Sequence, residues 1–100
     1  MQEEKRRWPS IALATEGSMT MFYTYILESE KFPTEYYVGS TSDLRQRVAD
    51  HNEGKQRYTR GNQPWKLVWY GGFPEKHQAA AFEKYLKSGS GHAFRKRHLL

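Results

Sequence analysis

The sequence predicts an α+β domain in which a small three-stranded antiparallel sheet is flanked by helices, in the order ββαβαα. Three segments rich in aromatic and β-branched residues indicate strands. Other segments repeat apolar residues three or four positions apart, which is typical of helices that cover a sheet. Strands and helices do not alternate over a series long enough for a doubly wound parallel sheet, so an antiparallel sheet is the economical arrangement.

The first two strands are expected to form a hairpin. The segments MFYTYILES (residues 21–29) and TEYYVGS (residues 34–40) favour strands, and the polar stretch with Pro33 between them indicates a turn. The third strand is WKLVWYGGF (residues 65–73), which ends at two consecutive glycines. A polar and basic loop over residues 55–64 comes before it.

The first helix is predicted between the second and third strands. Thr41 or Ser42 can cap its N-terminus, and Asp43 favours its first turn. The helix is expected to run to about Asn52, with Gly54 as its C-terminal stop.

Two more helices are predicted after the third strand. One opens at Pro74 and Glu75 and runs to about Lys87. The residues SGSG break it, because glycine is unfavourable inside a helix. The segment HAFRKRHLL (residues 92–100) then forms a short, basic last helix.

The composition fits a single folded domain. One hundred residues provide one modest core, and 37% hydrophobic with 15% aromatic residues favour folding over disorder. Residues 1–20 are expected to be a flexible N-terminal extension, ahead of a domain at residues 21–100. Their apolar patch is too short for a secretory signal, so that alternative is rejected.

The charge and the lack of cysteine limit which kinds of binding partner and which cellular compartment are expected. The net charge is +5 and arises wholly from residues 21–100, because the charges in residues 1–20 cancel. A basic domain favours a polyanionic partner, nucleic acid first and an anionic membrane second. The absence of cysteine excludes disulfides and cysteine-based zinc sites and fits the cytoplasm. No apolar run approaches the roughly 20 residues of a membrane span.

The first predicted helix carries basic side chains at the edge of the core. Leu44, Val48 and His51 lie along one stripe, because positions three or four apart share a helix face. Arg47 flanks this stripe. If the apolar members face the sheet, Arg47 and His51 lie near the end of the second strand.

The second strand brings tyrosines to the same place. Alternation along a strand separates Tyr36 from Tyr37, so only one of them is expected to face the pocket beside the helix. Gly39 permits either a tight turn or the close approach of a ligand.

These residue types suit phosphate chemistry. An arginine grips two phosphate oxygens and offsets the negative charge of a transition state. A tyrosine or a histidine beside a water molecule can take its proton. One acid is often needed to hold a divalent cation that polarises the phosphate. The best candidate for the acid is Glu83, which borders the apolar stripe of Ala79, Phe82 and Leu86.

Each of these residues also has a structural alternative. A tyrosine at the edge of a core often packs there and makes one hydrogen bond. Arg47 and Glu83 could form a structural ion pair. His51 could be a cation that interacts with the C-terminal end of the helix dipole.

The residues resemble the paired motifs of the GIY-YIG nucleases. Tyr23-Thr24-Tyr25 corresponds to the first motif, although tyrosine and threonine replace its usual glycine and isoleucine. Tyr37-Val38-Gly39 is close to the standard second motif. The continuation GSTSDLRQRVADH has the family's glycine, hydroxyl, acidic residue, arginine and histidine at the expected spacing. Glu83, within AFEKYLK, matches the metal-binding glutamate. The resemblance covers about residues 21–100 and is closest to small stand-alone bacterial members, which end in a similar KSGSG and a basic tail.

The resemblance implies the GIY-YIG fold and a metal-dependent endonuclease that hydrolyses phosphodiester bonds, with DNA repair or processing as its setting. Tyr25 and Tyr37 would face the attacking water, and one of them would help to deprotonate it. Arg47 would stabilise the phosphate, His51 would orient or shuttle a proton, and Glu83 would bind one divalent cation, Mg²⁺ ahead of Mn²⁺. We expect these five side chains to converge on one open cleft.

Nucleic acid, DNA ahead of RNA, is the expected partner, a protein partner is also possible, and the oligomeric state is open. A basic loop and a basic tail would bind the backbone through phosphate contacts. With two further residues at the site, the predicted binding residues are Ser40, Lys55, Arg57, Arg60, Lys87, Arg95, Lys96 and Arg97. Trp65, Trp69 and Tyr58 could stack on unpaired bases. Alternatively, both tryptophans could pack in the core, Trp69 above all, or Trp65 could simply cover the sheet edge.

A second class of function stays open from the sequence. The chain could be a binding module with the same fold and no catalysis. The altered first motif favours it, as does the lack of the late asparagine that the family often has after the second helix. The retained acid argues against it, because a pure nucleic-acid binder has little need for Glu83 among basic groups.

Overall fold

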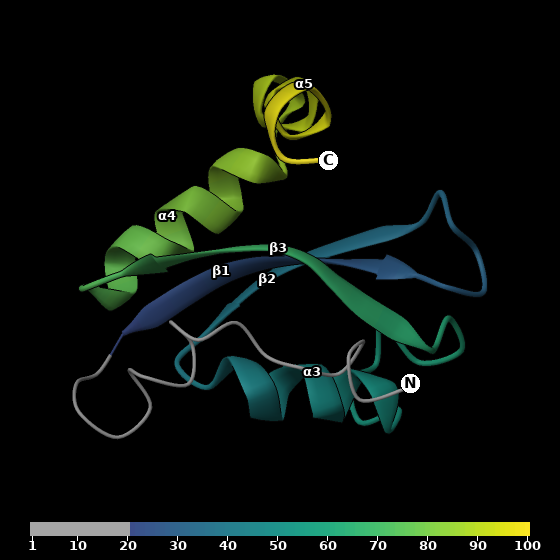
Figure 1. Cartoon of the computed structure of the whole chain (residues 1–100). Helices are drawn as coiled ribbons and strands as arrows, with labels where there is room; N and C mark the ends of the chain where they lie inside the picture. The colour runs from purple at the N-terminus through teal and green to yellow at the C-terminus, as the bar shows by residue number, and fades with distance from the viewer. Residues whose placement is uncertain (1–20) are drawn as a thin grey trace, which may run out of the picture.

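The computed structural model describes residues 21–100, so the predicted extension over residues 1–20 lies outside the described residues. Figure 1 shows a twisted sheet with helices on both of its faces. The elements are β1 (Phe22–Ser29), β2 (Tyr36–Thr41), α3 (Leu44–Asn52), β3 (Trp65–Phe73), α4 (Lys76–Leu86) and α5 (Gly89–His98). This is the predicted α+β class and the predicted order ββαβαα.

The three strands form one antiparallel sheet in the order β2-β1-β3. β1 is central because it is apolar on both faces, and all residues from Tyr23 to Leu27 are buried. β2 and β3 are the two edge strands. Tyr37 and the start of α3 lie at the edge formed by β2, and Tyr25 lies on the neighbouring central strand.

Alternation along β1 divides the core between the two faces of the sheet. Tyr23, Tyr25 and Leu27 face α3 and pack with Leu44 and Val48 of that helix. Ile26 of β1, Val38 of β2 and Leu86 of α4 form the core on the other face, with Phe94 and Leu99 packed against them. α3 therefore covers one face, and α4 with α5 covers the other (Figure 1).

The N-terminus of α3 differs from the prediction at its cap. The cap is Asp43, whose side chain accepts a hydrogen bond from the backbone N–H of Gln46 at 3.1 Å. The expected caps, Thr41 and Ser42, lie before it, and the Thr41 hydroxyl instead accepts from the Asp43 backbone N–H at 3.0 Å. A carboxylate caps a helix as well as a hydroxyl does, so residue type alone does not show which of Thr41, Ser42 and Asp43 is the cap.

α5 begins earlier than predicted, inside the SGSG segment. Ser88 caps it by accepting from the backbone N–H of Gly91 at 3.2 Å. A side chain at Gly91 would collide with the carbonyl oxygen of Tyr85, so this glycine lets α5 cross closely over the end of α4. The segment therefore both ends one helix and starts the next.

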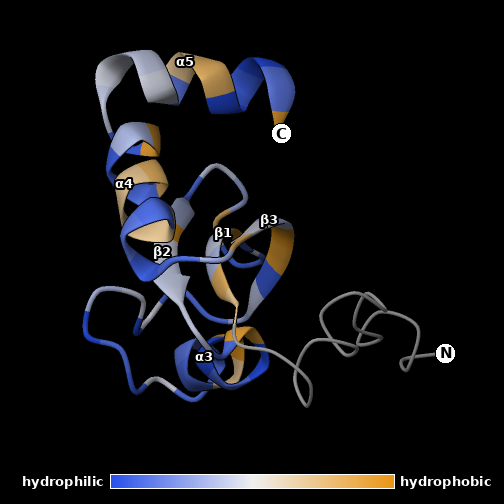
Figure 2. Cartoon of the chain, turned by 90° about the vertical axis from the view of Figure 1, so that its left-hand side faces the viewer, coloured by the Kyte–Doolittle hydropathy of each residue, from blue (hydrophilic) through white to orange (hydrophobic). Residues whose placement is uncertain are grey.

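The apolar and the basic residues of α5 lie in different parts of the helix. Figure 2 shows α5 running from nearly white residues through an orange apolar band to blue basic residues. Phe94 of this helix packs on the core of that face. Within residues 21–100, no helix has the length and apolar character needed to cross a membrane.

Candidate active site

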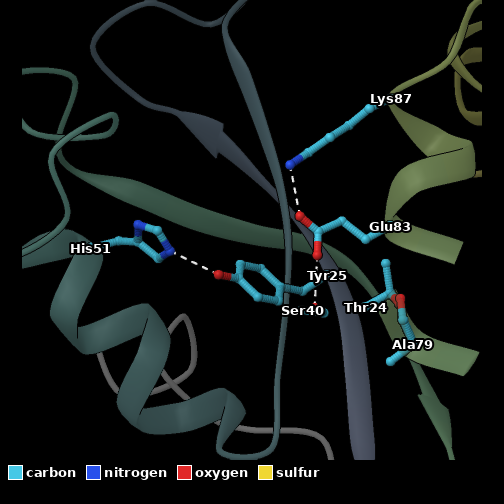
Figure 3. Close-up of polar contacts among 7 residues, drawn as sticks. All are labelled: Thr24, Tyr25, Ser40, His51, Ala79, Glu83 and Lys87. Atoms are coloured by element: carbon cyan, nitrogen blue, oxygen red, sulfur yellow. Dashed lines mark hydrogen bonds and ion pairs between the residues drawn. The ribbon is translucent and has the colours of Figure 1, made fainter. Parts of the chain in front are cut away.

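A buried hydrogen bond joins the first motif to the first helix. The Tyr25 hydroxyl of β1 lies 2.9 Å from Nε2 of His51 in α3. Both side chains are fully buried. Figure 3 shows the tyrosine ring directed across the space between strand and helix toward the imidazole. The predicted stripe of Leu44, Val48 and His51 is confirmed as the buried face of α3.

Gly39 makes room for this contact. It pairs with Tyr25 across the β1–β2 ladder. A Cβ atom at residue 39 would lie 2.6 Å from the Tyr25 hydroxyl oxygen and 3.0 Å from the Tyr37 ring. The glycine is therefore needed so that the Tyr25 ring can lie against the β2 backbone, rather than for a tight turn.

The two tyrosines of β2 separate as the alternation predicted. Tyr37 faces α3, with its ring centroid 4.8 Å from that of His51 and 6.3 Å from that of Tyr25. Tyr36 is exposed, and its hydroxyl donates a 3.4 Å hydrogen bond to Glu28. Only Tyr37 thus belongs to the cluster around Tyr25 and His51.

Burial and Arg47 set the charge of this cluster. Burial raises the pKa of Tyr25, the neighbouring Tyr37 raises it further, and Arg47 opposes both through its charge and a hydrogen bond. Burial, followed by the Arg47 charge, lowers the pKa of His51 to about 4, against the opposing effect of Asp50. At neutral pH the tyrosine is protonated and the imidazole is neutral. The alternative of His51 as a helix C-terminal cation is therefore wrong.

Thr59 completes the cluster, and sequence reasoning missed it. Its hydroxyl oxygen lies 2.7 Å from Nδ1 of His51, and the residue is fully buried although it belongs to the basic loop. A loop residue follows neither a helical nor a strand period, so no pattern in the sequence pointed to its burial.

Glu83 approaches from the other face of the sheet. α4 lies on the face opposite to α3, and the Glu83 carboxylate accepts a 2.7 Å hydrogen bond from the Ser40 hydroxyl on β2 (Figure 3). Lys87 forms a 2.7 Å ion pair with the same carboxylate, and its ammonium lies 5.8 Å from the centre of the Tyr37 ring. The ion pair of Glu83 is thus with Lys87 and not with Arg47.

The expectation of one open cleft is wrong in two respects. Tyr25 and His51 are fully buried, whereas Tyr37, Arg47 and Glu83 are half-buried. Glu83 also lies on the α4 side of the sheet, where it contacts Ser40 and Lys87, whereas the other four residues lie on the α3 side. It is still near enough to Tyr25 for its charge to add to the raised pKa of that tyrosine, after burial and Tyr37.

The site offers few protein ligands for a divalent cation. Within residues 21–100, no three His, Cys, Asp or Glu side chains come together as a ready metal site. Mg²⁺ is often held by one or two carboxylates, with water and substrate phosphate oxygens as its remaining ligands. The single carboxylate of Glu83 fits that pattern, provided that the cation displaces the Lys87 ammonium.

A family model described as the GIY-YIG catalytic domain matches residues 21–97. The chain belongs to the GIY-YIG family. This family is a nuclease superfamily, and the match spans every residue of the cluster around Tyr25 together with Glu83.

Several relatives of this GIY-YIG chain carry the name UPF0213. A UPF0213 protein of Streptococcus pneumoniae serotype 4 is 44% identical over 66 residues, which cover 65% of each chain. One of Clostridium perfringens strain 13 is 40% identical over 68 residues, covering 67% of this chain and 71% of that protein. The solution NMR structure of a UPF0213 protein from Bacillus halodurans is 32% identical, covers 79% of this chain and 86% of that chain, and has a TM-score of 0.48. The chain therefore spans slightly less than two thirds of the first of these relatives.

The basic loop of the GIY-YIG domain lies beside α3. Arg60 donates a 3.0 Å hydrogen bond to the Gly54 carbonyl at the end of that helix. Lys55 pairs with Glu53 at 3.1 Å, and Arg57 is exposed. These contacts hold the predicted loop cations close to the element that carries Arg47.

The basic tail lies in α5, in the layer on the other face of the sheet (Figure 1). Lys96 and Arg97 are exposed, whereas Arg95 is half-buried and contacts Nδ1 of His92 at 2.8 Å. The loop and the tail thus do not form one continuous patch, and Arg95 has a structural environment of its own.

The predicted stacking aromatics of the GIY-YIG domain divide into core and surface. Trp65 is buried in the α3-side core, and Trp69 packs with Phe82 on the α4 side. Tyr58 is 86% exposed in the basic loop. Of the three, only Tyr58 remains a candidate for stacking on bases.

Proposed function

We propose that the chain is a metal-dependent endonuclease that hydrolyses phosphodiester bonds in DNA and acts in DNA repair or processing. The observation that supports this best is the hydrogen bond from Tyr25 to a neutral His51, with Arg47 beside both. A structural core would not need a buried histidine hydrogen-bonded to a buried tyrosine with an arginine charge acting on both, whereas phosphate hydrolysis uses a proton acceptor next to a phosphate-binding cation.

The Tyr25 hydroxyl is the group that takes the proton of the attacking water. As its oxygen accepts that proton, its own proton passes to Nε2 of His51, 2.9 Å away. Burial raises the pKa of Tyr25 and so disfavours an ionised tyrosine. Because the two protons move together, this route does not require the tyrosine to ionise first. Tyr37, half-buried next to both residues, orients the water and covers the pair.

Arg47 binds the scissile phosphate and changes the basicity of His51. In the free protein the Arg47 charge helps to lower the pKa of His51 to about 4, second to burial. A phosphate held by Arg47 offsets that charge, so the pKa of His51 rises when substrate binds. The imidazole becomes a better proton acceptor only when a phosphate is present to be cut.

Glu83 would hold Mg²⁺ or Mn²⁺ at the β2 edge, together with water and phosphate oxygens. A bound divalent cation polarises the phosphate and offsets the charge that builds up in the transition state. Ser40 fixes the carboxylate through its 2.7 Å hydrogen bond. Lys87 neutralises Glu83 in the free protein and is released to contact the nucleic acid.

A nucleic-acid-binding module without catalysis is the second candidate. The full burial of Tyr25 and His51 favours it, because water reaches neither residue until a neighbouring side chain moves. The ion pair between Lys87 and Glu83 favours it as well, since a permanently neutralised carboxylate would not repel phosphate.

A cleavage assay separates the two candidates. The full chain is incubated with end-labelled single-stranded, duplex, flap and four-way DNA, and with matching RNA, in Mg²⁺, Mn²⁺ or EDTA. The nuclease proposal expects cleavage of at least one DNA substrate with metal and none in EDTA. Binding without cleavage of any substrate in either metal would make the binding module the better account.

A further inference from the structure

We infer that Thr59 is a positioning residue that fixes the tautomer of His51. With the imidazole proton held on Nδ1 by Thr59, Nε2 is left as an acceptor for the Tyr25 hydroxyl. The consequence for catalysis rests on the proposed nuclease function, whereas the tautomer itself does not.

The geometry of Thr59 is closely determined. Its hydroxyl oxygen is 2.7 Å from Nδ1 of His51, and no part of the residue is exposed. Two neighbours hold its backbone carbonyl: the Trp65 indole N–H donates to it at 3.0 Å, and the Asn62 backbone N–H donates at 3.2 Å. These bonds fix the backbone of Thr59 in the place from which its buried hydroxyl reaches the imidazole.

Counting protons decides the direction of these hydrogen bonds. A threonine hydroxyl has one proton, and a longer contact of 3.4 Å lets Thr59 donate it to the Gln56 carbonyl. Nδ1–H of His51 then donates to Thr59, and the Tyr25 hydroxyl donates to Nε2. Every proton in this chain of contacts has an acceptor.

The reverse arrangement leaves a buried proton without a partner. If Thr59 donated to Nδ1, His51 would carry its proton on Nε2 and donate it to Tyr25. Within residues 21–100, the Tyr25 hydroxyl has no acceptor other than Nε2 of His51, because Arg47 is a donor only. A buried hydroxyl proton without an acceptor costs about 1–3 kcal/mol, so the Nδ1–H tautomer is favoured.

The tautomer matters for the proposed chemistry. An imidazole with its proton on Nε2 presents a donor to Tyr25 and cannot receive the tyrosine's proton. In other enzymes the group on the second ring nitrogen of a histidine sets which nitrogen is free to act. Thr59 occupies that position beside Nδ1 of His51, although the residues next to it in the loop, Tyr58 and Arg60, are exposed.

The test compares Thr59→Val, which keeps the shape, with Thr59→Ser, which keeps the hydroxyl. Nitrogen-15 chemical shifts of the imidazole at pH 7 report which ring nitrogen carries the proton. The chain has four histidines, and His51→Asn identifies the signals that belong to residue 51. The parent and Thr59→Ser are expected to show the Nδ1–H tautomer, and Thr59→Val a substantial Nε2–H population. If the parent cuts DNA, Thr59→Val should lower kcat about 10- to 100-fold and leave KM nearly unchanged.

Thr24→Val is the matched control. Thr24 is equally buried and donates a 2.8 Å hydrogen bond to the Ala79 carbonyl, on the face of the sheet away from His51. It should lose stability to a similar extent and keep the parent tautomer. The inference is overturned if Thr59→Val retains the Nδ1–H tautomer, or if Thr24→Val shifts the tautomer equally. A parent that cuts nothing would remove the nuclease proposal alone, because the nitrogen shifts still decide the role of Thr59.

Discussion

The Tyr25 hydroxyl and Nε2 of His51 are 2.9 Å apart in a fully buried contact that ties the central strand to the helix on its lower face in Figure 1. Neither side chain is charged at neutral pH, since burial is the first cause of both pKa shifts. The pair is therefore a stable feature of the fold and also a ready path for one proton.

The protein should become less stable as the pH is lowered, because His51 is buried in its neutral form. Its pKa is 6.5 in an unfolded chain and about 4 in the fold, so between these values the unfolded state binds more protons. The contribution is complete above pH 6.5 and is lost as the pH falls to about 4, a loss on the order of 2–3 kcal/mol. Chemical denaturation of the parent and of His51→Gln over this range measures it. Equal pH slopes for the two proteins would show that the pKa of His51 is the same in the fold as in the unfolded chain.

Gly39→Ala should displace the Tyr25 ring. The added Cβ would lie 2.6 Å from the Tyr25 hydroxyl oxygen, and the ring is buried with no space to retreat. We expect a loss of about 1–3 kcal/mol in the free energy of unfolding, together with loss of cleavage. Gly89→Ala is the control, because a Cβ there meets no atom within 4 Å and should cost nothing. A Gly39→Ala protein as stable and as active as the parent would contradict the packing described for this strand pair.

Glu83→Gln separates catalysis from binding. The amide keeps the shape and can still accept from Ser40, but it loses the charge that would hold a cation. Mg²⁺-dependent cleavage should fall by more than about 100-fold, or about 2.7 kcal/mol, while metal-free binding stays equal or tightens slightly.

Arg47→Ala should weaken both cleavage and binding, since arginine contacts phosphate in the ground state and in the transition state. Thermal unfolding checks that each variant is folded. A folded Glu83→Gln protein with the parent rate would remove the metal assignment.

The basic segments can be tested through the salt dependence of binding. Arg57→Glu with Arg60→Glu changes the loop beside α3, and Lys96→Glu with Arg97→Glu changes the exposed part of α5. Removing one cation that binds a phosphate should reduce the slope of log affinity against log salt by about 1. We expect both double variants to bind more weakly with a smaller slope. A pair of substitutions that leaves the slope unchanged excludes its segment from the interface.

Most of the fold was predictable because its signals are local. Aromatic and β-branched runs predicted all three strands, and the stripe of Leu44, Val48 and His51 predicted the buried face of α3. Helix ends were less certain, since Asp43 and the SGSG segment each allow more than one cap. The chemistry of the cap residues does not choose among neighbours one or two positions apart.

The site was only partly predictable because its decisive features are tertiary. Nothing local shows that Tyr25 is fully buried, or that Thr59 turns inward from a polar loop between exposed neighbours. The approach of Glu83 around the β2 edge, with Lys87 between it and Tyr37, depends on how α4 crosses the sheet. Residue types along the chain named the candidates, but the structure was needed to show which of them touch.

Single-turnover cleavage by Tyr25→Phe tests whether the Tyr25 hydroxyl takes the proton of the attacking water. The substitution removes one oxygen atom, the one that is proposed to take the proton of the attacking water. Tyr36→Phe is the matched control, because Tyr36 is exposed, lies outside the cluster around Tyr25 and donates its hydrogen bond to Glu28, at 3.4 Å. With saturating enzyme and Mg²⁺, we expect Tyr25→Phe to cut at least about 100-fold more slowly than the parent, while Tyr36→Phe cuts at the parent rate. A folded Tyr25→Phe protein that cuts as fast as the parent would show that the Tyr25 hydroxyl is not the proton acceptor.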